Sequence, residues 1–359
     1  MAKKRKDGYI EKTVTIDGKR VHVYGHTERE IREKIDQLYD EQYNGITNDI
    51  TFKDYGEHWY EVALVDKTES TRISYRRDLN HAIKIIGKLK VHDIKRSEIE
   101  RGLNDFIDRP ATREKVLGII RMIFNMPVDD KICSYNPTQN IKLEKVQREV
   151  RNRLSRQETE MVKNAVLDEQ ERLLVDVLYY TGLRRGEALA LTRKSIGDGI
   201  IHVTEQRQWH TNGSPYTTSL KSFNSKRDVP IPVDLEKRLR KFAKKMGTIY
   251  IFEAISTKHK FTNAWMKIQV AFLKVANPEY TTRRSLRFLT IGEIPCRITP
   301  HVLRHNYCSL LHDNGVDVLV AQKLMGHATV ATTLSVYTHL DEESKDKRFD
   351  EVRDIFSAM

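Results

Sequence analysis

The sequence has few cysteines and no long apolar run. The three cysteines, Cys133, Cys296 and Cys308, are odd in number and lack the spacing of metal ligands, which argues against a disulfide framework and a zinc site. No window offers the roughly 18 consecutive apolar residues of a spanning helix, and the opening M-A-K-K-R-K lacks the apolar core of a signal peptide. We therefore expect a cytoplasmic protein without a membrane-spanning helix and with reduced, structural thiols.

Negative charge is scarce relative to positive charge. The 62 lysines and arginines outnumber the 50 aspartates and glutamates, so the net charge is +12 and the isoelectric point is near 9.4. Basic residues occur in every segment, which favours a polyanionic partner, with nucleic acid first, although a ribosomal or membrane-surface protein would look similar. The 359 residues are enough for about two or three domains, and a composition of 39% hydrophobic and 31% charged residues excludes wholesale disorder.

Residues 1–46 have the pattern of a small β-sheet followed by a helix. Residues 9–16 and 19–24 alternate in polarity around a D-G pair, which is typical of a two-residue hairpin turn. Thr27 and Glu30 form a capping box that predicts the start of a helix. A strand ribbon with one helix can enter a DNA groove, whereas the alternative is a basic segment that only stabilises the next domain. The candidate DNA contacts of this module are Lys3, Lys4, Arg5, Lys19 and Arg20.

Residues 47–143 predict a helical bundle. Apolar residues recur at helical spacing in four stretches with short joins, and we expect these stripes to form a core rather than a cofactor pocket. Arg72, Arg76 and Arg77 lie on the polar side of the second stretch, where they either contact the DNA backbone or are simply solvated.

A linker and a second domain follow the bundle. Residues 144–153 are polar, charged and free of glycine, so they predict an interdomain linker, in which Arg151 and Arg153 are further candidates for DNA contacts. Residues 154–340 predict a mixed α/β domain that is mostly helical, and residues 341–359 predict a charged C-terminal helix. The short strands of the second domain are expected near 200–206, 216–220 and 227–231.

A segment near the C-terminus concentrates residue types that bind phosphate. The T-P pair at 299–300 predicts a helix N-terminus, and it places His301 and Arg304 one turn apart on one face. Backbone N–H groups, the helix dipole and a guanidinium fork all favour a bound phosphate there. His327 follows the glycine that ends a second short helix, and Tyr337 comes after a threonine-rich run in which we expect a further helical turn or two. A single histidine or tyrosine of this kind is more commonly a core residue.

The patterns H-x-x-R, G-H and Y-x-H, in this order and at this spacing, resemble the C-terminal signature of the tyrosine recombinase (phage integrase) family. The family also carries an arginine in a T-G-x-R segment, and T-G-L-R at 181–184 matches it with Arg184. Neighbouring helical side chains point about 100° apart, so Arg185 is expected at the surface. The resemblance covers the whole chain in organisation, and it is specific in the C-terminal half.

The family's lysine lies on a β-hairpin that precedes a basic strand with prolines. The segment 218–232 has this form, and Lys221 is the match, on the turn between the second and third predicted strands. Leu220 and Ser222 stand where proline and threonine are frequent in the family, and Lys226 is a nearby rival. Both lysines are therefore candidates for the general acid that protonates the departing 5′-oxygen.

The resemblance implies DNA cleavage through a covalent intermediate. Tyr337 would attack the scissile phosphorus and form a 3′-phosphotyrosine, which conserves the energy of the phosphodiester bond without a nucleotide cofactor. Arg184 and Arg304 would clamp the two non-bridging oxygens, and His327 would donate a further hydrogen bond. His301 would accept the proton of the tyrosine or orient the phosphate.

The polar residues beside these motifs are expected to have supporting roles. Glu187 would brace Arg184 or His301, whereas His305 and His339 would be structural. The arginines supply the positive charge that magnesium provides in other enzymes, and no cluster of carboxylates in the sequence indicates a metal site.

The resemblance also implies an assembly on DNA. In integrases of conjugative transposons and lambda-like phages, a small β-sheet-plus-helix domain binds arm sites, and a helical core-binding domain closes one side of a clamp around the crossover site. The partners implied are double-stranded DNA with core and arm attachment sites, further copies of the chain in a tetramer on paired sites, and an accessory excision factor. The helix at 341–359 carries Phe349, Val352 and Phe356 along one stripe, which either docks on a neighbouring protomer or folds back on its own domain.

The expected function is therefore that of an integrase that integrates and excises a mobile element. A type IB topoisomerase, which cleaves one strand and lets it swivel, is the first alternative, but the N-terminal module and the segment after Tyr337 favour the recombinase. A non-catalytic DNA-binding protein with the same fold is the second alternative. All six catalytic positions carry the expected residue types, which argues against such a loss of activity.

Overall fold

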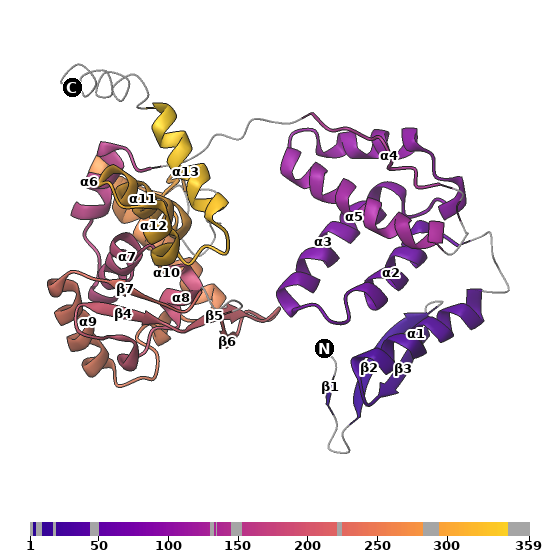
Figure 1. The fold of residues 1–359 in the computed structure, drawn as a ribbon, viewed down its shortest axis with the longest axis horizontal. Helices are drawn as coiled ribbons and strands as arrows, with labels where there is room; N and C mark the ends of the chain where they lie inside the picture. Colours follow the sequence, from indigo (N-terminus) through magenta and orange to yellow (C-terminus); the bar gives the residue numbers. More distant parts are fainter. Residues whose placement is uncertain are drawn as a thin grey trace, which may run out of the picture. The chain divides into compact units, whose positions relative to one another are not determined.

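A computed structural model describes most of the chain, which consists mainly of helices with small β-sheets (Figure 1). The chain divides into two compact units, Met1–Arg148 and Glu149–Met359. The predicted fold class is confirmed, since a hairpin module, a helical region and a mixed, mainly helical domain follow one another along the chain. The described residues are 3–4, 9–16, 19–43, 50–129, 133, 135–144, 153–220, 225–282 and 294–343.

The first unit begins with an antiparallel sheet, of strand order β1-β2-β3, and one helix. The helix starts where the sequence predicts it, because Thr27 Oγ1 accepts a hydrogen bond from the N–H of Glu30 at 3.1 Å. The elements are β1 (Lys3–Lys4), β2 (Ile10–Ile16), β3 (Lys19–Gly25) and α1 (Glu28–Tyr43). Alternate strand residues and one stripe of the helix form a small core of Val14, Val23, Ile31 and Ile35.

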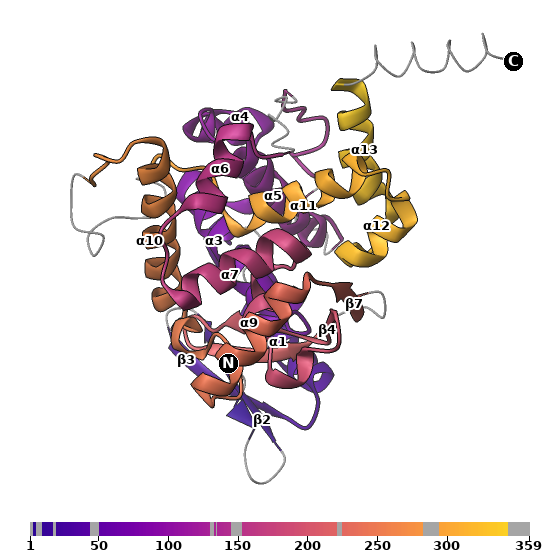
Figure 2. The ribbon, with the colours of Figure 1, turned by 90° about the vertical axis from the view of Figure 1, so that its left-hand side faces the viewer.

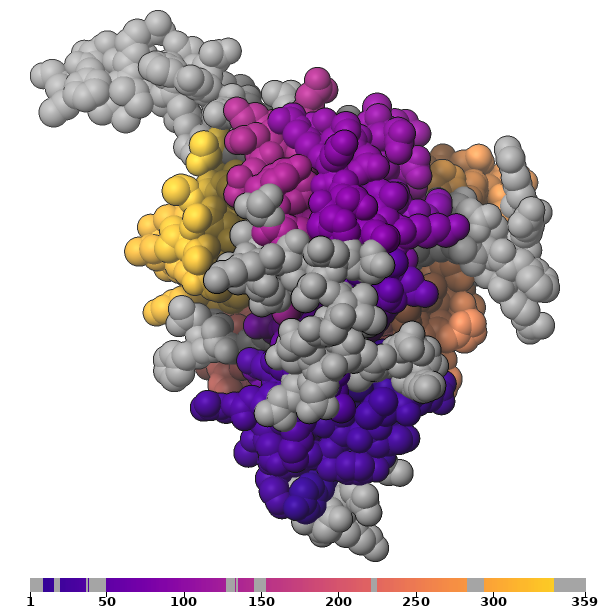
Figure 3. Space-filling view, turned by 90° about the vertical axis from the view of Figure 1, so that its right-hand side faces the viewer, coloured from indigo at the N-terminus to yellow at the C-terminus, as the bar shows by residue number. Residues whose placement is uncertain are grey.

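The rest of this unit contains the predicted helical bundle, drawn in purple in Figure 3. The rings of Phe52 and Phe124 stack in its core with centroids 5.7 Å apart, as the helical spacing of the apolar residues predicts. The module packs against the bundle through Val62 and through an ion pair of 3.0 Å between Lys12 Nζ and Glu61 Oε2. The helices are α2 (Phe52–Ala63), α3 (Glu69–Ile86), α4 (Arg96–Leu103) and α5 (Pro110–Asp129), with 3₁₀ turns at Val91–Asp93 and Asn104–Phe106.

The second unit combines helices with two small antiparallel sheets. Its helices are α6 (Arg156–Asn164), α7 (Glu169–Thr181), α8 (Arg185–Leu189), α9 (Val233–Met246), α10 (Lys258–Ala276), α11 (Pro300–Asp313), α12 (Val318–Met325) and α13 (Val330–Glu343). Its strands are β4 (Ile200–Val203), β5 (Glu205–Trp209), β6 (Pro215–Ser219) and β7 (Arg227–Pro230).

The strands differ from the prediction in their continuity and in their pairing. The first predicted strand is interrupted at Thr204, so that β4 and β5 belong to different sheets. β4 pairs with β7 and β5 pairs with β6, which means that β6 and β7 do not form the hairpin predicted around Lys221. The segment between Ser219 and Arg227 therefore connects two sheets, and Lys221 itself lies outside the described residues.

The core of the second unit is formed around α7 and α10. The predicted apolar residues of α7, Leu174 and Val177 among them, are fully buried, and so is Trp265 of α10. α10 is the longest helix of this unit among the described residues and runs from Lys258 to Ala276. The threonine-rich run forms the start of α13, a continuous helix that extends past Tyr337 and is longer than the turn or two expected there. Figure 2 shows α11, α12 and α13 beside one another, and they contact each other directly.

Candidate active site

Arg184 is held at the start of α8 by a sharp turn at the end of α7. Gly182 ends α7 with φ of +60°, and a Cβ there would lie 2.4 Å from the ring of Tyr307, so only glycine fits. Arg184 then donates from its backbone N–H to Glu187 Oε2 at 2.9 Å and from Nη1 to Glu187 Oε1 at 2.7 Å. Its Nη2 donates to the carbonyl oxygen of Gly326 at 2.9 Å. The side chain is 40% exposed, so an oriented guanidinium meets solvent at this place.

Arg304 is buried directly beside this turn. It projects from α11, donates from Nη1 to the carbonyl oxygen of Gly182 at 2.7 Å and from Nη2 to that of Met325 at 2.5 Å. Burial, followed by the repulsion of Arg184, lowers the pKa of Arg304 to about 9, so the side chain is still a cation at neutral pH. Both predicted arginines thus lie in one place, between the end of α7 and the end of α12.

Glu187 forms an ion pair with Arg184, and it has a second partner. Arg227 donates from Nη2 to Glu187 Oε2 at 2.8 Å and from Nη1 to Oε1 at 3.3 Å, and both side chains are almost completely buried. Burial alone would raise the pKa of Glu187, but Arg227, Arg184 and Arg304 outweigh it, so the pKa is lowered and the carboxylate is ionised.

Arg227 is the residue that the sequence reasoning missed. The segment K-R-D-V-P places it two residues before the buried Val229, on the same face of β7. An arginine at an inward-facing strand position predicts a buried carboxylate partner, and this was the available signal.

The histidines lie around the arginine pair. His301 Nε2 is 2.9 Å from His305 Nε2, so His305, expected to be structural, directly contacts a candidate catalytic group. His327 follows Gly326 and its Nδ1 is 2.8 Å from Thr333 Oγ1. Burial, followed by Arg304 and Arg184, lowers the pKa of His327 to about 4, so the ring is neutral at pH 7. The same causes, in the order burial, Arg304 and Arg184, lower the pKa of His301.

Tyr337 is buried, and its hydroxyl is bound within the protein. Its hydroxyl donates to the carbonyl oxygen of Val316 at 3.1 Å, and its ring meets the ring of His312 edge-on at 4.7 Å between centroids. Burial, followed by Cys308 and Asp317, raises the pKa of the phenol to about 12. The structure therefore brings the arginines and His327 together, but it does not hydrogen-bond the tyrosine hydroxyl to either arginine. Its role as the nucleophile stays a prediction.

The candidate general acids are only partly visible. Lys221 lies outside the described residues, and its rival Lys226 is exposed just before β7. The side chain of His339 also lies outside the described part. Their roles stay predictions.

The candidate DNA contacts also stay predictions. Arg76 stacks over the ring of Tyr60, with Cζ 3.7 Å from the centroid, and pairs with Glu57, so it has partners inside the protein. Arg72 lies 3.8 Å from Glu61. Arg77 pairs with Asp78 and is more exposed, Arg20 is exposed, and Arg153 lies 3.7 Å from Asp313. The side chains of Lys3, Lys4 and Lys19, together with Arg5 and Arg151, lie outside the described part.

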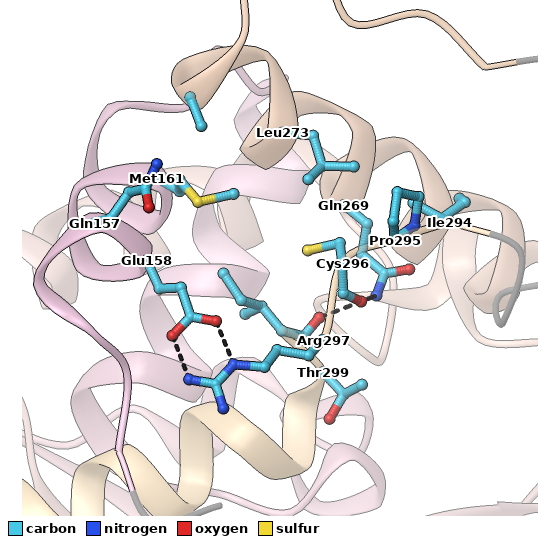
Figure 4. A pocket seen from close by; sticks show the side chains of 12 residues that line it. Gln157, Glu158, Met161, Gln269, Leu273, Ile294, Pro295, Cys296, Arg297 and Thr299 are labelled. Atoms are coloured by element: carbon cyan, nitrogen blue, oxygen red, sulfur yellow. Dashed lines mark hydrogen bonds and ion pairs between the residues drawn. The ribbon is translucent and has the colours of Figure 1, made fainter.

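A cavity of about 680 Å³ lies where α6 and α10 meet the start of α11 (Figure 4). An ion pair between Glu158 and Arg297 lines it, with Arg297 Nη2 2.6 Å from Glu158 Oε2. Gln269 uses its amide group to donate to the carbonyl oxygens of Cys296 and Ile298, while its Oε1 accepts no hydrogen bond from the described residues. None of the six predicted catalytic residues lines this cavity.

The described residues contain no group of three or more histidine, cysteine or acidic side chains placed to hold a metal ion. No helix in the described part is long and apolar enough to cross a membrane.

Comparisons with known proteins show which family the catalytic unit resembles. Residues 152–344, which include all six predicted catalytic positions, match the model of the Phage integrase family. The "Tyrosine recombinase XerC-like" protein of Caldanaerobacter subterraneus subsp. tengcongensis is 26% identical over 97% of this chain and 96% of its own length. The ICEBs1 integrase of Bacillus subtilis is also 26% identical, over 77% of this chain and 73% of its own length.

Solved structures share the fold at lower identity. The Tn1549 transposon integrase in complex with transposon right end DNA superposes with a TM-score of 0.64 at 17% identity, over 89% of this chain and 99% of that one. A lambda integrase dimer bound to a COC′ core site gives a TM-score of 0.56 at 17% identity, over 94% of each chain. A lambda integrase tetramer bound to a Holliday junction gives 0.57 at 16% identity, over 91% of this chain and 95% of that one.

Proposed function

The chain belongs to the phage integrase family, and we propose that it cuts and rejoins DNA through a 3′-phosphotyrosine at Tyr337 to integrate and excise a mobile element. The family membership makes it a tyrosine site-specific recombinase. The observation that best supports this proposal is that the guanidinium groups of Arg184 and Arg304 both donate to carbonyl oxygens of the turn between α12 and α13.

The arginine pair suits a phosphoryl-transfer transition state. Attack on a phosphodiester concentrates negative charge on two non-bridging oxygens, and two preorganised cations stabilise that charge more than they stabilise the ground state. Arg304 is buried and fixed by two carbonyl oxygens, while Arg184 is half exposed and held by Glu187. Neutral His327 would add a hydrogen bond from its second ring nitrogen.

The bond changes balance without a cofactor. The oxygen of Tyr337 forms a bond to phosphorus as the bond from phosphorus to the 5′-oxygen breaks. The tyrosine proton passes to His301 or to water, and Lys221, with Lys226 as the alternative, protonates the 5′-oxygen. Rejoining reverses these steps when a 5′-hydroxyl of the partner duplex attacks the phosphotyrosine.

Tyr337 has to leave its contact with Val316 before it can attack. Its hydroxyl is hydrogen-bonded and its pKa is raised in the described state, so the phenol is a weak nucleophile there. DNA binding would shift α13 and present the phenol to the phosphate held by Arg184 and Arg304. This step makes cleavage depend on correct assembly.

The proposed partners are core and arm attachment sites in double-stranded DNA, three further copies of the chain in a tetramer, and an accessory excision factor, all in the cytoplasm. The lambda integrase structures, as a dimer on a core site and a tetramer on a Holliday junction, support such an assembly. The helix predicted at 341–359 would dock on a neighbouring protomer, or fold back, and residues 344–359 lie outside the described part.

The experiment that tests this function measures strand transfer. Purified protein is incubated with two DNA duplexes that carry the ends of its own element and a target site, and recombinant junctions are detected on a gel and by sequencing. A recombinase gives junctions, and Tyr337→Phe gives none. Relaxation of supercoiled plasmid without junctions would favour the topoisomerase. Sequence-specific binding without either product would favour a non-catalytic DNA-binding protein.

A further inference from the structure

We infer that Arg227 is a positioning residue of the cleavage reaction, which acts on the phosphate through Glu187 and Arg184. This inference rests on the proposed function. Arg227 does not contact the predicted phosphate position itself, since all four of its hydrogen bonds in the described structure go to protein oxygens.

Arg227 and Arg184 share one carboxylate. Oε1 of Glu187 accepts from Nη1 of both arginines, and Oε2 accepts from the Arg184 backbone N–H and from Arg227 Nη2. Four hydrogen bonds saturate the carboxylate, which fixes its plane and thereby the direction of the Arg184 guanidinium. Only Nη1 of the Arg184 guanidinium binds the carboxylate, and Nη2 binds the carbonyl oxygen of Gly326, so Nε is left for another acceptor.

The charges explain why a second arginine is useful. Arg184 and Glu187 alone would form a neutral pair, whose attraction for a phosphate is weak. With Arg227 included, the three groups carry a net charge of +1, and the buried carboxylate divides its attraction between two cations. Arg227 therefore offsets part of the negative charge of Glu187. The three groups together then present a net positive charge to the DNA, while Glu187 still holds Arg184 in place.

Arg227 also joins this carboxylate to the turn that carries His327. Its Nε donates to the carbonyl oxygen of Leu324 at 2.7 Å, near the end of α12. Gly326, with φ of +62°, follows, and a Cβ there would lie 2.8 Å from Arg227 Nη1. The next carbonyl oxygens, of Met325 and Gly326, are the acceptors of Arg304 and Arg184. One side chain thus sets the relative positions of β7, α8 and α12.

Only an arginine can make these contacts. A planar fork reaches two carboxylate oxygens and a carbonyl oxygen at once, whereas lysine offers one ammonium group on a flexible stem. Arg227→Lys keeps the buried charge and removes the fork, so it tests the geometry with the smallest change in electrostatics.

A matched control exists in the same unit. Arg207 is also buried, and it also binds one carboxylate with two nitrogens, at 2.7 Å and 3.4 Å. Its carboxylate partner is Glu253, whereas that of Arg227 is Glu187. Arg207→Lys therefore measures the general cost of loosening a bidentate arginine–glutamate pair whose arginine is buried and whose carboxylate is 39% exposed.

The experiment measures single-turnover formation of the covalent protein–DNA complex, and DNA affinity in parallel, for wild type, Arg227→Lys, Arg207→Lys, Arg184→Lys and the Arg184→Lys/Arg227→Lys pair. We expect Arg227→Lys to slow cleavage about 10- to 100-fold, which is the range seen when a residue that orients a metal ligand is replaced. The DNA affinity should stay within about threefold of wild type. In the Arg184→Lys background the same change should cost less than about threefold, because the residue through which it acts is already altered.

Two outcomes would overturn the inference. One is a cleavage rate of Arg227→Lys that equals that of Arg207→Lys. The other is an equal fold-loss with and without Arg184→Lys, which would mean a general structural role. If Arg227→Lys does not fold, Glu187→Gln/Arg227→Gln removes both buried charges together, and it should fold yet cleave as slowly as Arg184→Lys. Wild-type protein that binds DNA without any covalent complex would instead reject the proposed function, independently of Arg227.

Discussion

Arg184 and Arg304 donate to adjacent carbonyl oxygens, those of Gly326 and Met325, at 2.9 Å and 2.5 Å. Two cations that would repel each other are therefore held at one turn by backbone dipoles and by Glu187. The repulsion is visible in the lowered pKa of Arg304, to which burial contributes most and Arg184 next. A phosphodiester placed at this turn would relieve it.

The first prediction concerns the arginines. Arg304→Lys should slow single-turnover cleavage by about 10²- to 10³-fold, because lysine cannot bind two acceptors with a planar fork and the transition state loses a preorganised donor. DNA affinity, measured by gel shift, should change far less. Arg193→Lys, at an exposed position of the same unit, serves as the control. A loss below about threefold for Arg304→Lys would contradict its assigned role.

The second prediction concerns the turn that supports Arg304. Gly182→Ala should reduce the free energy of unfolding by about 1–3 kcal/mol, through the left-handed conformation and the clash with Tyr307. Gly199→Ala has a similar φ of +72° with no atom within 4 Å, so it should cost about 1 kcal/mol. Urea unfolding measures both. Equal decreases in the free energy of unfolding for the two variants would show that the clash with Tyr307 does not destabilise the protein.

The third prediction concerns pH. The pKa of His327 is lowered to about 4, so between about pH 4 and about pH 6.5 the unfolded chain binds more protons at this residue than the folded domain. The stability that His327 contributes is fully present above about pH 6.5 and is lost as the pH falls through this window. NMR of the DNA-free protein should show no titration of the His327 ring above about pH 5.5, and His327→Gln should make the unfolding free energy less dependent on pH. A midpoint near pH 6.5 would contradict the burial seen here.

The fourth prediction concerns α13. Because the hydroxyl of Tyr337 is bound to Val316 and must reach the phosphate, DNA should change the amide hydrogen exchange of Val330–Glu343. The helix α7, whose side chains are mostly buried, is the internal reference and should not change. Unchanged exchange in α13 during productive cleavage would show that the tyrosine reaches the phosphate without a movement of this helix.

Local patterns predicted most of the fold and part of the site. Thr27 with Glu30 and the T-P pair before His301 mark helix starts through short-range hydrogen bonds, which a sequence displays directly. The break at Thr204 was missed, because the pairing of β4 with β7 and of β5 with β6 depends on residues far apart in the chain.

The features of the site that the sequence did not predict also depend on contacts between residues far apart in the chain. The resemblance to the family's motifs pointed to Arg184, His301, Arg304 and His327, and the structure places these four residues close together. Arg227 was not found, since its partner Glu187 is 40 residues away and the ion pair exists only after folding. The buried position of Tyr337 could not be predicted either, because it depends on packing against α11 and α12.

The most direct test of the account is covalent attachment. A duplex with one end of the element is nicked just beyond the expected cleavage point, so that the released fragment diffuses away and cannot be rejoined, and the reaction is analysed on a denaturing gel. The account predicts a DNA-shifted band that resists SDS and disappears in Tyr337→Phe, while that variant binds DNA within about twofold of wild type. Covalent complex at the wild-type level in Tyr337→Phe would contradict the assignment of the nucleophile.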